Sequence, residues 1–239
     1  MTESSRVVTL FTQEFGKVKA VARGVGKPKS KMSGVIEMFN LIEGLLYKKE
    51  NVELGTLGTA SVLNSFPRIS IEPKKFGFGS AWCEVLDKTS FPDHPRSMTF
   101  ELTNDLLKTF NTIIPENAGL IFWSGLYKML LIEGYSPRLD GCISCGNGEF
   151  NNVIEISFER GGLICKKCGK AEEASRKISA DALDLIKNMN NLEFEQLIEL
   201  NTSPKTGKEA ADIILSLASY HLGLPRNLKS FKFLDTITG

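Results

Sequence analysis

The chain has 239 residues, 42% of them hydrophobic and 24% charged, a composition typical of one or two globular domains with a sizeable core. Its 29 basic and 28 acidic residues nearly cancel, so the net charge of +1 neither indicates nor excludes a nucleic-acid partner. No run of about 18 apolar residues is present and no apolar signal segment opens the chain, which argues against a membrane-spanning helix and for a reducing cytoplasm.

Short strand-like runs fill the first 66 residues. They cover 7–11, 17–22, 36–47 and 57–63, and turn residues bound each of them. The run 17–22 alternates polar and apolar side chains, which predicts a strand with one buried face and one cationic, solvent-facing side. Several short strands in so short a stretch favour a small barrel, because closure removes exposed strand edges.

Basic residues are concentrated between residues 16 and 35, where no acidic residue occurs: Lys17, Lys19, Arg23, Lys27, Lys29 and Lys31. Gly, Pro and Ser break up the second half of this segment, which predicts a mobile loop between two strands. Such a segment favours contact with a phosphate backbone, and the alternative is a merely solvated face. Phe11, Phe15 and Phe39 are candidate stacking surfaces for bases, or else interior residues of the barrel.

After Phe66 the apolar residues recur at helical spacing. Helices are predicted around 78–86, 102–114 and 116–133, and a later helix begins after the capping residue Ser179. The last long helix, 205–222, ends at Gly223 and Pro225. A basic and aromatic tail follows, with Arg226, Lys229 and Lys232.

Four cysteines form two Cys-x-x-Cys pairs separated by nineteen residues: Cys142, Cys145, Cys165 and Cys168. Two such pairs, each followed by Gly, predict a tetrahedral zinc site with four thiolate ligands. Four thiolates leave no open position for water, so the zinc is expected to be structural. The alternatives are an iron–sulfur cluster and a site that no longer binds metal. Two disulfides are disfavoured, because they suit small secreted scaffolds.

The sequence motifs that could indicate catalysis are all incomplete. The Gly-Lys pairs at 26–27 and 207–208 both lack the spacing of a phosphate-binding loop. His94 and His221 lack a partner four residues away, and no paired-carboxylate site for acid–base catalysis can be named. Cys83 lies beside Trp82 in an apolar pattern and is expected to be a core residue. The sequence therefore indicates a protein that is not an enzyme.

Six stretches that span nearly the whole chain follow a known family pattern: 7–19 (VVTLFTQEFGKVK), 22–33 (ARGVGKPKSKMS), 53–66, 139–146 (LDGCISCG), 163–169 (LICKKCG) and 220–234 (YHLGLPRNLKSFKFL). In these stretches the chain resembles the RecO recombination-mediator proteins of bacteria. The resemblance implies an α+β fold: an N-terminal OB-fold-like β-barrel at 1–66, an all-α domain at 67–139 and 173–239, and a four-cysteine zinc-binding insertion at 140–172.

The family resemblance also implies a function in DNA repair and homologous recombination. RecO-like proteins bind single- and double-stranded DNA, anneal complementary strands, and with RecR help RecA replace single-strand DNA-binding protein (SSB). A bacterial protein of this kind is expected in the cytoplasm, associated with the nucleoid. By position, Lys19, Arg23, Lys27, Lys29 and Lys31 match the family's basic barrel region, to which Lys17 is adjacent, and Arg226, Lys229 and Lys232 match its basic C-terminal end.

One departure from the family pattern concerns the N-terminus. Family members usually begin with an extra strand before the segment equivalent to 3–5, so we expect either a start site assigned too late or a barrel short of one strand. A missing strand would expose an edge. The alternative function is therefore a non-catalytic, zinc-stabilised adaptor that binds a protein through its helices and carries a degenerate barrel.

Overall fold

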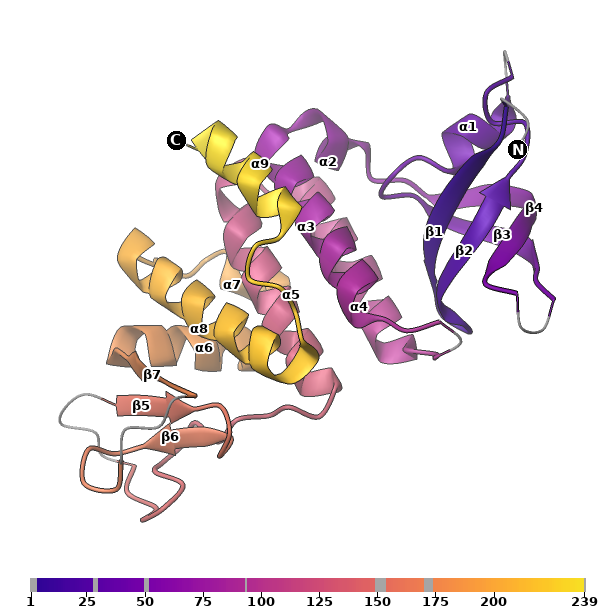
Figure 1. Ribbon diagram of the computed structural model, residues 1–239. Helices are drawn as coiled ribbons and strands as arrows, with labels where there is room; N and C mark the ends of the chain where they lie inside the picture. Colours follow the sequence, from indigo (N-terminus) through magenta and orange to yellow (C-terminus); the bar gives the residue numbers. More distant parts are fainter. Residues whose placement is uncertain are drawn as a thin grey trace. The chain divides into compact units, whose positions relative to one another are not determined.

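The structure is a computed structural model that describes residues 4–27, 30–49, 52–92, 94–148, 154–169 and 174–238 (Figure 1). Strands dominate the first part of the chain and helices most of the remainder, which confirms the α+β class. The chain forms two compact units. The first consists of Met1–Ala118 and Leu228–Gly239, and the second of Gly119–Asn227. Among the helices that the described residues form, none has the length and apolarity to cross a bilayer.

The first unit begins with a four-stranded sheet, the indigo and purple arrows of Figure 1. Its strands are β1 (Arg6–Thr12), β2 (Gly16–Ala22), β3 (Leu41–Tyr47) and β4 (Leu54–Asn64), in the order β1-β2-β4-β3. β2 runs antiparallel to β1 and parallel to β4, and β3 runs antiparallel to β4. The predicted alternation in β2 is confirmed, because Val18, Ala20 and Ala22 are buried.

Closure of this sheet into a barrel is not observed among the described strands, since β1 and β3 are its two edges. A short helix, α1 (Lys31–Val35), occupies part of the predicted loop, and β3 begins at Leu41 instead of residue 36. The reason lies in two apolar side chains, Met32 and Ile36, which pack against the cluster of Ala20, Ala22, Val25 and Leu57. They cover one face of the sheet and give it an OB-like core without a closed ring of strands.

The other helices of the first unit are α2 (Pro67–Ile71), α3 (Pro73–Thr89), α4 (Ser97–Thr112), the short 3-10 helix η1 (Pro115–Asn117) and α9 (Lys229–Thr238). Trp82 of α3 is fully buried, and its indole N–H donates to Thr103 Oγ1 at 3.1 Å. Phe76 meets both Phe39 and Phe233 edge-on, each with ring centroids 5.9 Å apart. The C-terminal helix α9 is thus held on α3 by apolar and aromatic contact.

The second unit contains α5 (Ala118–Ile132, with Ala118 in the first unit), α6 (Ala180–Asn191), α7 (Phe194–Leu197) and α8 (Pro204–Leu222). Between α5 and α6 in the chain lie the short strands β5 (Ile154–Ser157), β6 (Gly162–Ile164) and β7 (Ser175–Ile178), in the order β6-β5-β7. The Ser179 hydroxyl accepts from the Ala182 N–H at 3.3 Å, and Gly223 ends α8 with a φ of 65°. Both predicted helix boundaries are therefore confirmed.

The start of β2 lies directly against the loop that follows α3. Gly16 forms an isolated bridge with Pro92, and its φ of 63° lies in the left-handed region. A Cβ added at Gly16 would come within 2.2 Å of the His94 carbonyl oxygen and 3.1 Å of the Phe91 carbonyl oxygen. Only glycine permits this backbone approach, which ties the sheet to the end of α3.

Replacement of Gly16 by Ala is expected to lower the free energy of unfolding by about 3 kcal/mol, because left-handed strain adds to the clash with the loop. Gly24→Ala is the matched control. Its φ is 72°, but a Cβ there would meet only the Lys27 Cδ, at 3.8 Å. It is expected to cost about 1 kcal/mol. Urea unfolding measures both variants, and equal costs would contradict the close approach.

The N-terminus of α9 is capped by a carboxylate from α3. Glu84 accepts the backbone N–H groups of Lys229 and Ser230, each at 3.0 Å, and the Ser230 hydroxyl at 2.7 Å. Partial burial of Glu84 opposes ionisation, but these hydrogen bonds outweigh it and hold the pKa of its carboxyl below the ordinary value of 4.5. The ionised carboxylate therefore stabilises the docked helix.

Glu84→Ala is expected to lower the free energy of unfolding at pH 7 by about 1–2 kcal/mol, because two helix amides lose their acceptor. The folded-state pKa is depressed, so this contribution is present above pH 4.5 and is lost as the pH falls through the folded-state value. The difference between the wild type and the variant should narrow below pH 4.5. Glu101→Ala, at an exposed position of α4, is the control, and a pH-independent difference would refute the assignment.

Candidate functional site

The four cysteines of the two Cys-x-x-Cys pairs come together in the second unit. Their Sγ atoms all lie within 4.8 Å of one another, and Cys145 Sγ and Cys165 Sγ are 3.8 Å apart. A metal–sulfur bond of about 2.3 Å puts the corners of a tetrahedron about 3.8 Å apart. Among the described residues this is the only group of three or more His, Cys, Asp or Glu side chains arranged to hold a metal ion.

Each pair of cysteines lies in a tight backbone turn. In the first turn the Gly146 N–H donates to the Cys142 carbonyl oxygen at 2.8 Å, and Gly146 adopts a φ of 74°. In the second turn the Gly169 N–H donates to the Cys165 carbonyl oxygen at 2.9 Å. The two turns are linked by a bond from the Ile143 N–H to the Leu163 carbonyl oxygen, at 2.8 Å. The backbone therefore aligns all four thiols.

Backbone amides also make the site favourable for thiolate. Cys142 is buried, and its Sγ accepts from the Cys165 N–H at 3.4 Å. Burial by itself raises the pKa of this thiol, but bonds from the amides of Cys165, Cys145 and Ser144 lower it to about 6. Hydrogen bonds with Cys145 and Cys165 raise the pKa of the Cys168 thiol to about 12, so a bound metal would have to displace its proton. A soft four-sulfur donor set fits a tetrahedral metal ion, so Cys142, Cys145, Cys165 and Cys168 form a candidate metal centre.

The cysteine turns are attached to the small sheet β6-β5-β7. The Leu163 N–H donates to the Arg138 carbonyl oxygen at 3.0 Å, so the segment before Cys142 runs along β6. Ile156 and Leu163 are fully buried and form part of the core beneath the turns. Cys142 and Cys165 thereby gain a rigid base, whereas Cys145 is exposed.

On β2, the first two cations of the basic segment have acidic neighbours that lie far away in the sequence. Lys17 Nζ donates to the Asp87 carbonyl oxygen at 2.6 Å and lies 3.6 Å from its carboxylate. Lys19 Nζ donates to Glu53 Oε1 at 2.6 Å, which raises the pKa of Lys19. The sequence segment contains no acid, but the tertiary structure supplies two.

The remaining predicted DNA-contact residues are distributed over both units. Arg23, Lys27 and Lys31 are exposed, and in the described part of the chain no acidic group pairs with them. Lys29 lies outside the described residues. Arg226 bonds to the Asp212 carboxylate and, at 2.6 Å, to the Ser216 hydroxyl. Lys229 and Lys232 are exposed on α9.

The three candidate aromatic platforms have different environments. Phe39 is buried, at 5% exposure, and Phe11 packs against Phe100 with ring centroids 6.1 Å apart. Phe15 is 51% exposed. Phe11 is partly buried, so Phe15 is the one exposed ring of the three.

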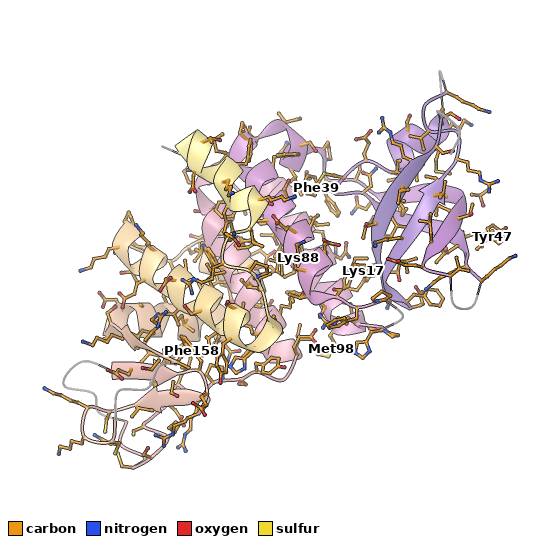
Figure 2. The ribbon with its side chains drawn as sticks, viewed as in Figure 1. Lys17, Phe39, Tyr47, Lys88, Met98 and Phe158 are labelled. Atoms are coloured by element: carbon orange, nitrogen blue, oxygen red, sulfur yellow. The ribbon has the colours of Figure 1, made fainter. Side chains whose placement is uncertain are left out.

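The sequence did not single out two further lysines beside β2. Lys48, after β3, and Lys88, at the end of α3, line a pocket together with Lys17 and Lys19 (Figure 2, where Lys17 and Lys88 are labelled). Residues 17 and 88 are far apart in the chain, so no local pattern connects them. Only the contact between β2 and the α3 end reveals this grouping.

Cys83 and His221 occupy positions that fit structural roles. Desolvation raises the pKa of the Cys83 thiol to about 11, which disfavours the thiolate needed for nucleophilic attack. His221 lies in the last turn of α8, where its ring stacks on Tyr135 at 4.6 Å. Desolvation lowers the pKa of this imidazole.

Comparison with known proteins covers nearly the whole chain. Residues 1–66 match the family described as recombination protein O N terminal, and residues 72–230 match recombination protein O C terminal. Similar proteins named DNA repair protein RecO occur in Halalkalibacterium halodurans (28% identity, covering 98% of this chain and 89% of the relative) and Desulfitobacterium hafniense strain Y51 (31%, 87% and 75%). Another occurs in Listeria monocytogenes (29%, 97% and 88%). With both family models matched in order along the chain, this protein belongs to the RecO family.

Proposed function

We propose that this protein acts in DNA repair and homologous recombination, where it binds single- and double-stranded DNA and anneals complementary strands. Membership of the RecO family supports this role, and its relatives are named for DNA repair. The observation that carries the proposal is the group of exposed cations on one segment of the first unit, Arg23, Lys27 and Lys31, which no described acidic group neutralises. Cations of this kind bind phosphates without regard to base sequence.

Strand annealing and mediator activity require contacts that form and break easily. Each exposed lysine contributes a weak, salt-sensitive phosphate contact, so several of them hold a strand while it still exchanges partners. We propose, from the family resemblance, that the protein works with RecR and SSB and thereby helps to load RecA onto SSB-coated DNA. Action on chromosomal DNA would place it in the bacterial cytoplasm, at the nucleoid.

The metal that we propose for the four cysteines is zinc, in a structural role. Four thiolates match the coordination number and softness that zinc prefers, and they leave no position for a reactive water. We also propose that the protein is not an enzyme. The raised pKa of Cys83 supports this view, because its thiol stays protonated at neutral pH.

Single-stranded DNA is expected to bind at low salt and to dissociate steeply as salt rises. For four to six phosphate contacts, the slope of log K against log salt should be roughly −3 to −4. The double variant Lys27→Glu/Lys31→Glu should flatten the slope by about 1.4 and weaken binding of every sequence about tenfold or more. The charge-matched control is Lys205→Glu/Lys208→Glu on α8, where both lysines are exposed. Fluorescence anisotropy of a labelled oligonucleotide measures each slope, and binding that ignores salt would favour the protein-adaptor alternative.

Metal analysis is expected to find about one zinc per chain in protein purified without chelator. Cys145→Ser should remove the metal and destabilise the folded chain by about 4 kcal/mol, the size of effect expected when a metal site is lost. For a chain of this length, that loss lowers Tm by about 8–16 °C. Single-stranded DNA affinity at a temperature where the variant remains folded should change little, because the exposed cations 23, 27 and 31 lie in the other unit. A variant with native melting behaviour but no DNA binding would contradict the structural role.

A further inference from the structure

A pocket of about 180 Å³ lies between the sheet and the C-terminal end of α3 in the first unit. We call it the α3-end pocket, and its lining is Lys17, Val18, Lys19, Lys48, Glu53, Lys88, Ser90, Phe91 and Pro92. Its walls come from β2, from the two ends of the β3–β4 connection, and from the end of α3 with the loop that follows it. The bridge between Gly16 and Pro92 holds the first and last of these walls together.

The pocket is cationic. Among the residues that the structure describes, four lysines line it against one carboxylate, Glu53, while the Asp87 carboxylate lies 3.6 Å from Lys17 Nζ and 3.9 Å from Lys88 Nζ. The Lys19–Glu53 pair is solvent-accessible, with side-chain exposures of 46% and 71%. Exposed ion pairs contribute little stability, so an incoming phosphate can replace Glu53 at small cost.

A buried hydroxyl also lines the α3-end pocket. Ser90 is only 3% exposed, and its Oγ has no hydrogen-bond partner among the described residues. The Ser90 N–H is already used, since it donates to the Leu86 carbonyl oxygen at 3.0 Å. A buried hydroxyl without a hydrogen-bond partner destabilises the fold unless a ligand or a water molecule supplies that partner. An anionic oxygen in the pocket would accept a hydrogen bond from the Ser90 hydroxyl.

An aromatic ring lies at the mouth of the same pocket. Phe91 is 65% exposed, although large aromatic side chains usually bury most of their surface. Its backbone is fixed, because the Phe91 carbonyl oxygen lies against Gly16 and the next residue, Pro92, bridges to Gly16. A fixed, exposed ring beside several lysines has the composition of a single-stranded nucleic-acid site, in which a base stacks and a phosphate is neutralised.

We propose that the α3-end pocket binds one nucleotide of single-stranded DNA, with Lys17, Lys19, Lys48 and Lys88 around its phosphate and Phe91 stacked on its base. This inference rests on the proposed function and extends the DNA path from the sheet to the helices of the first unit. A purely structural role, in which cations interact with the negative C-terminal end of α3, accounts for Lys17 and Lys88. The ion pair with Glu53 accounts for Lys19 in a similar way. Neither interaction accounts for the Ser90 hydroxyl or the exposed ring.

Two substitutions separate the phosphate contact from the base contact, and both positions are exposed, so the fold should survive. Lys88→Glu is expected to weaken binding of labelled oligothymidylate about tenfold and to flatten the salt slope by about 0.7. Phe91→Ala should weaken it about 5- to 150-fold, the range for loss of one stacked base. The charge-matched control for Lys88→Glu is Lys108→Glu on α4, which should bind as the wild type does.

Binding of an abasic oligonucleotide of equal length separates the base contact from the phosphate contact. This oligonucleotide has the phosphates but no bases, so Phe91→Ala should bind it as tightly as the wild type does, whereas Lys88→Glu should still bind it more weakly. Phe91→Trp should restore binding of oligothymidylate. An equal loss by Phe91→Ala on both oligonucleotides would overturn the nucleotide assignment.

The outcomes also distinguish this inference from the proposed function. If Lys27→Glu/Lys31→Glu weakens binding but Lys88→Glu and Phe91→Ala match the wild type, the α3-end pocket is not a DNA subsite and the proposed function stands. If the wild type itself shows no salt-dependent binding, both are overturned. Thermal melting of each variant, expected within a few degrees of the wild type, confirms that the loop remains folded.

Discussion

The close approach of the Gly16 backbone to the loop that follows α3 is the contact on which the N-terminal unit depends. It brings the first residue of β2 against Phe91 and His94, at a distance that leaves no room for a side chain. The adjacent residue, Lys17, then reaches the Asp87 carbonyl at the end of α3. A glycine conformation thus determines which lysines of the sheet and of the helices share one pocket.

In the second unit, the cysteine cluster is placed to stabilise a small sheet. Three strands of three or four residues form too small a sheet to be stable alone, although Ile156 and Leu163 bury their side chains. Four sulfurs that converge on one point join the segment before β5 to the segment after β6. A metal held there would act as a cross-link that supplies the stability a short sheet lacks.

The lysines near the sheet of the first unit fall into two groups. Lys17 and Lys19 are held by acidic partners, so their side chains are oriented before any ligand arrives. Lys27, in the segment after β2, and Lys31, at the start of α1, are exposed and have no described acidic partner. Oriented and free cations suit different steps of strand handling, because the first favour placement of a phosphate and the second favour rapid, salt-sensitive capture. A nearly neutral chain can therefore present a strongly cationic segment.

The sequence by itself determined the features that depend on neighbouring residues. Local spacing predicts four such features, and the structure confirms them: the alternation in β2, the cap at Ser179, the end of α8 at Gly223, and the two Cys-x-x-Cys turns that each present two thiols. Only the tertiary structure decided the features that depend on distant residues: the open sheet with α1 across its face, the burial of Phe39, the pairing of Lys19 with Glu53, and the placement of Lys88 beside Lys17. The physical reason is that side-chain periodicity records which face of an element is buried, whereas the partner that covers this face is set by packing between segments far apart in the chain.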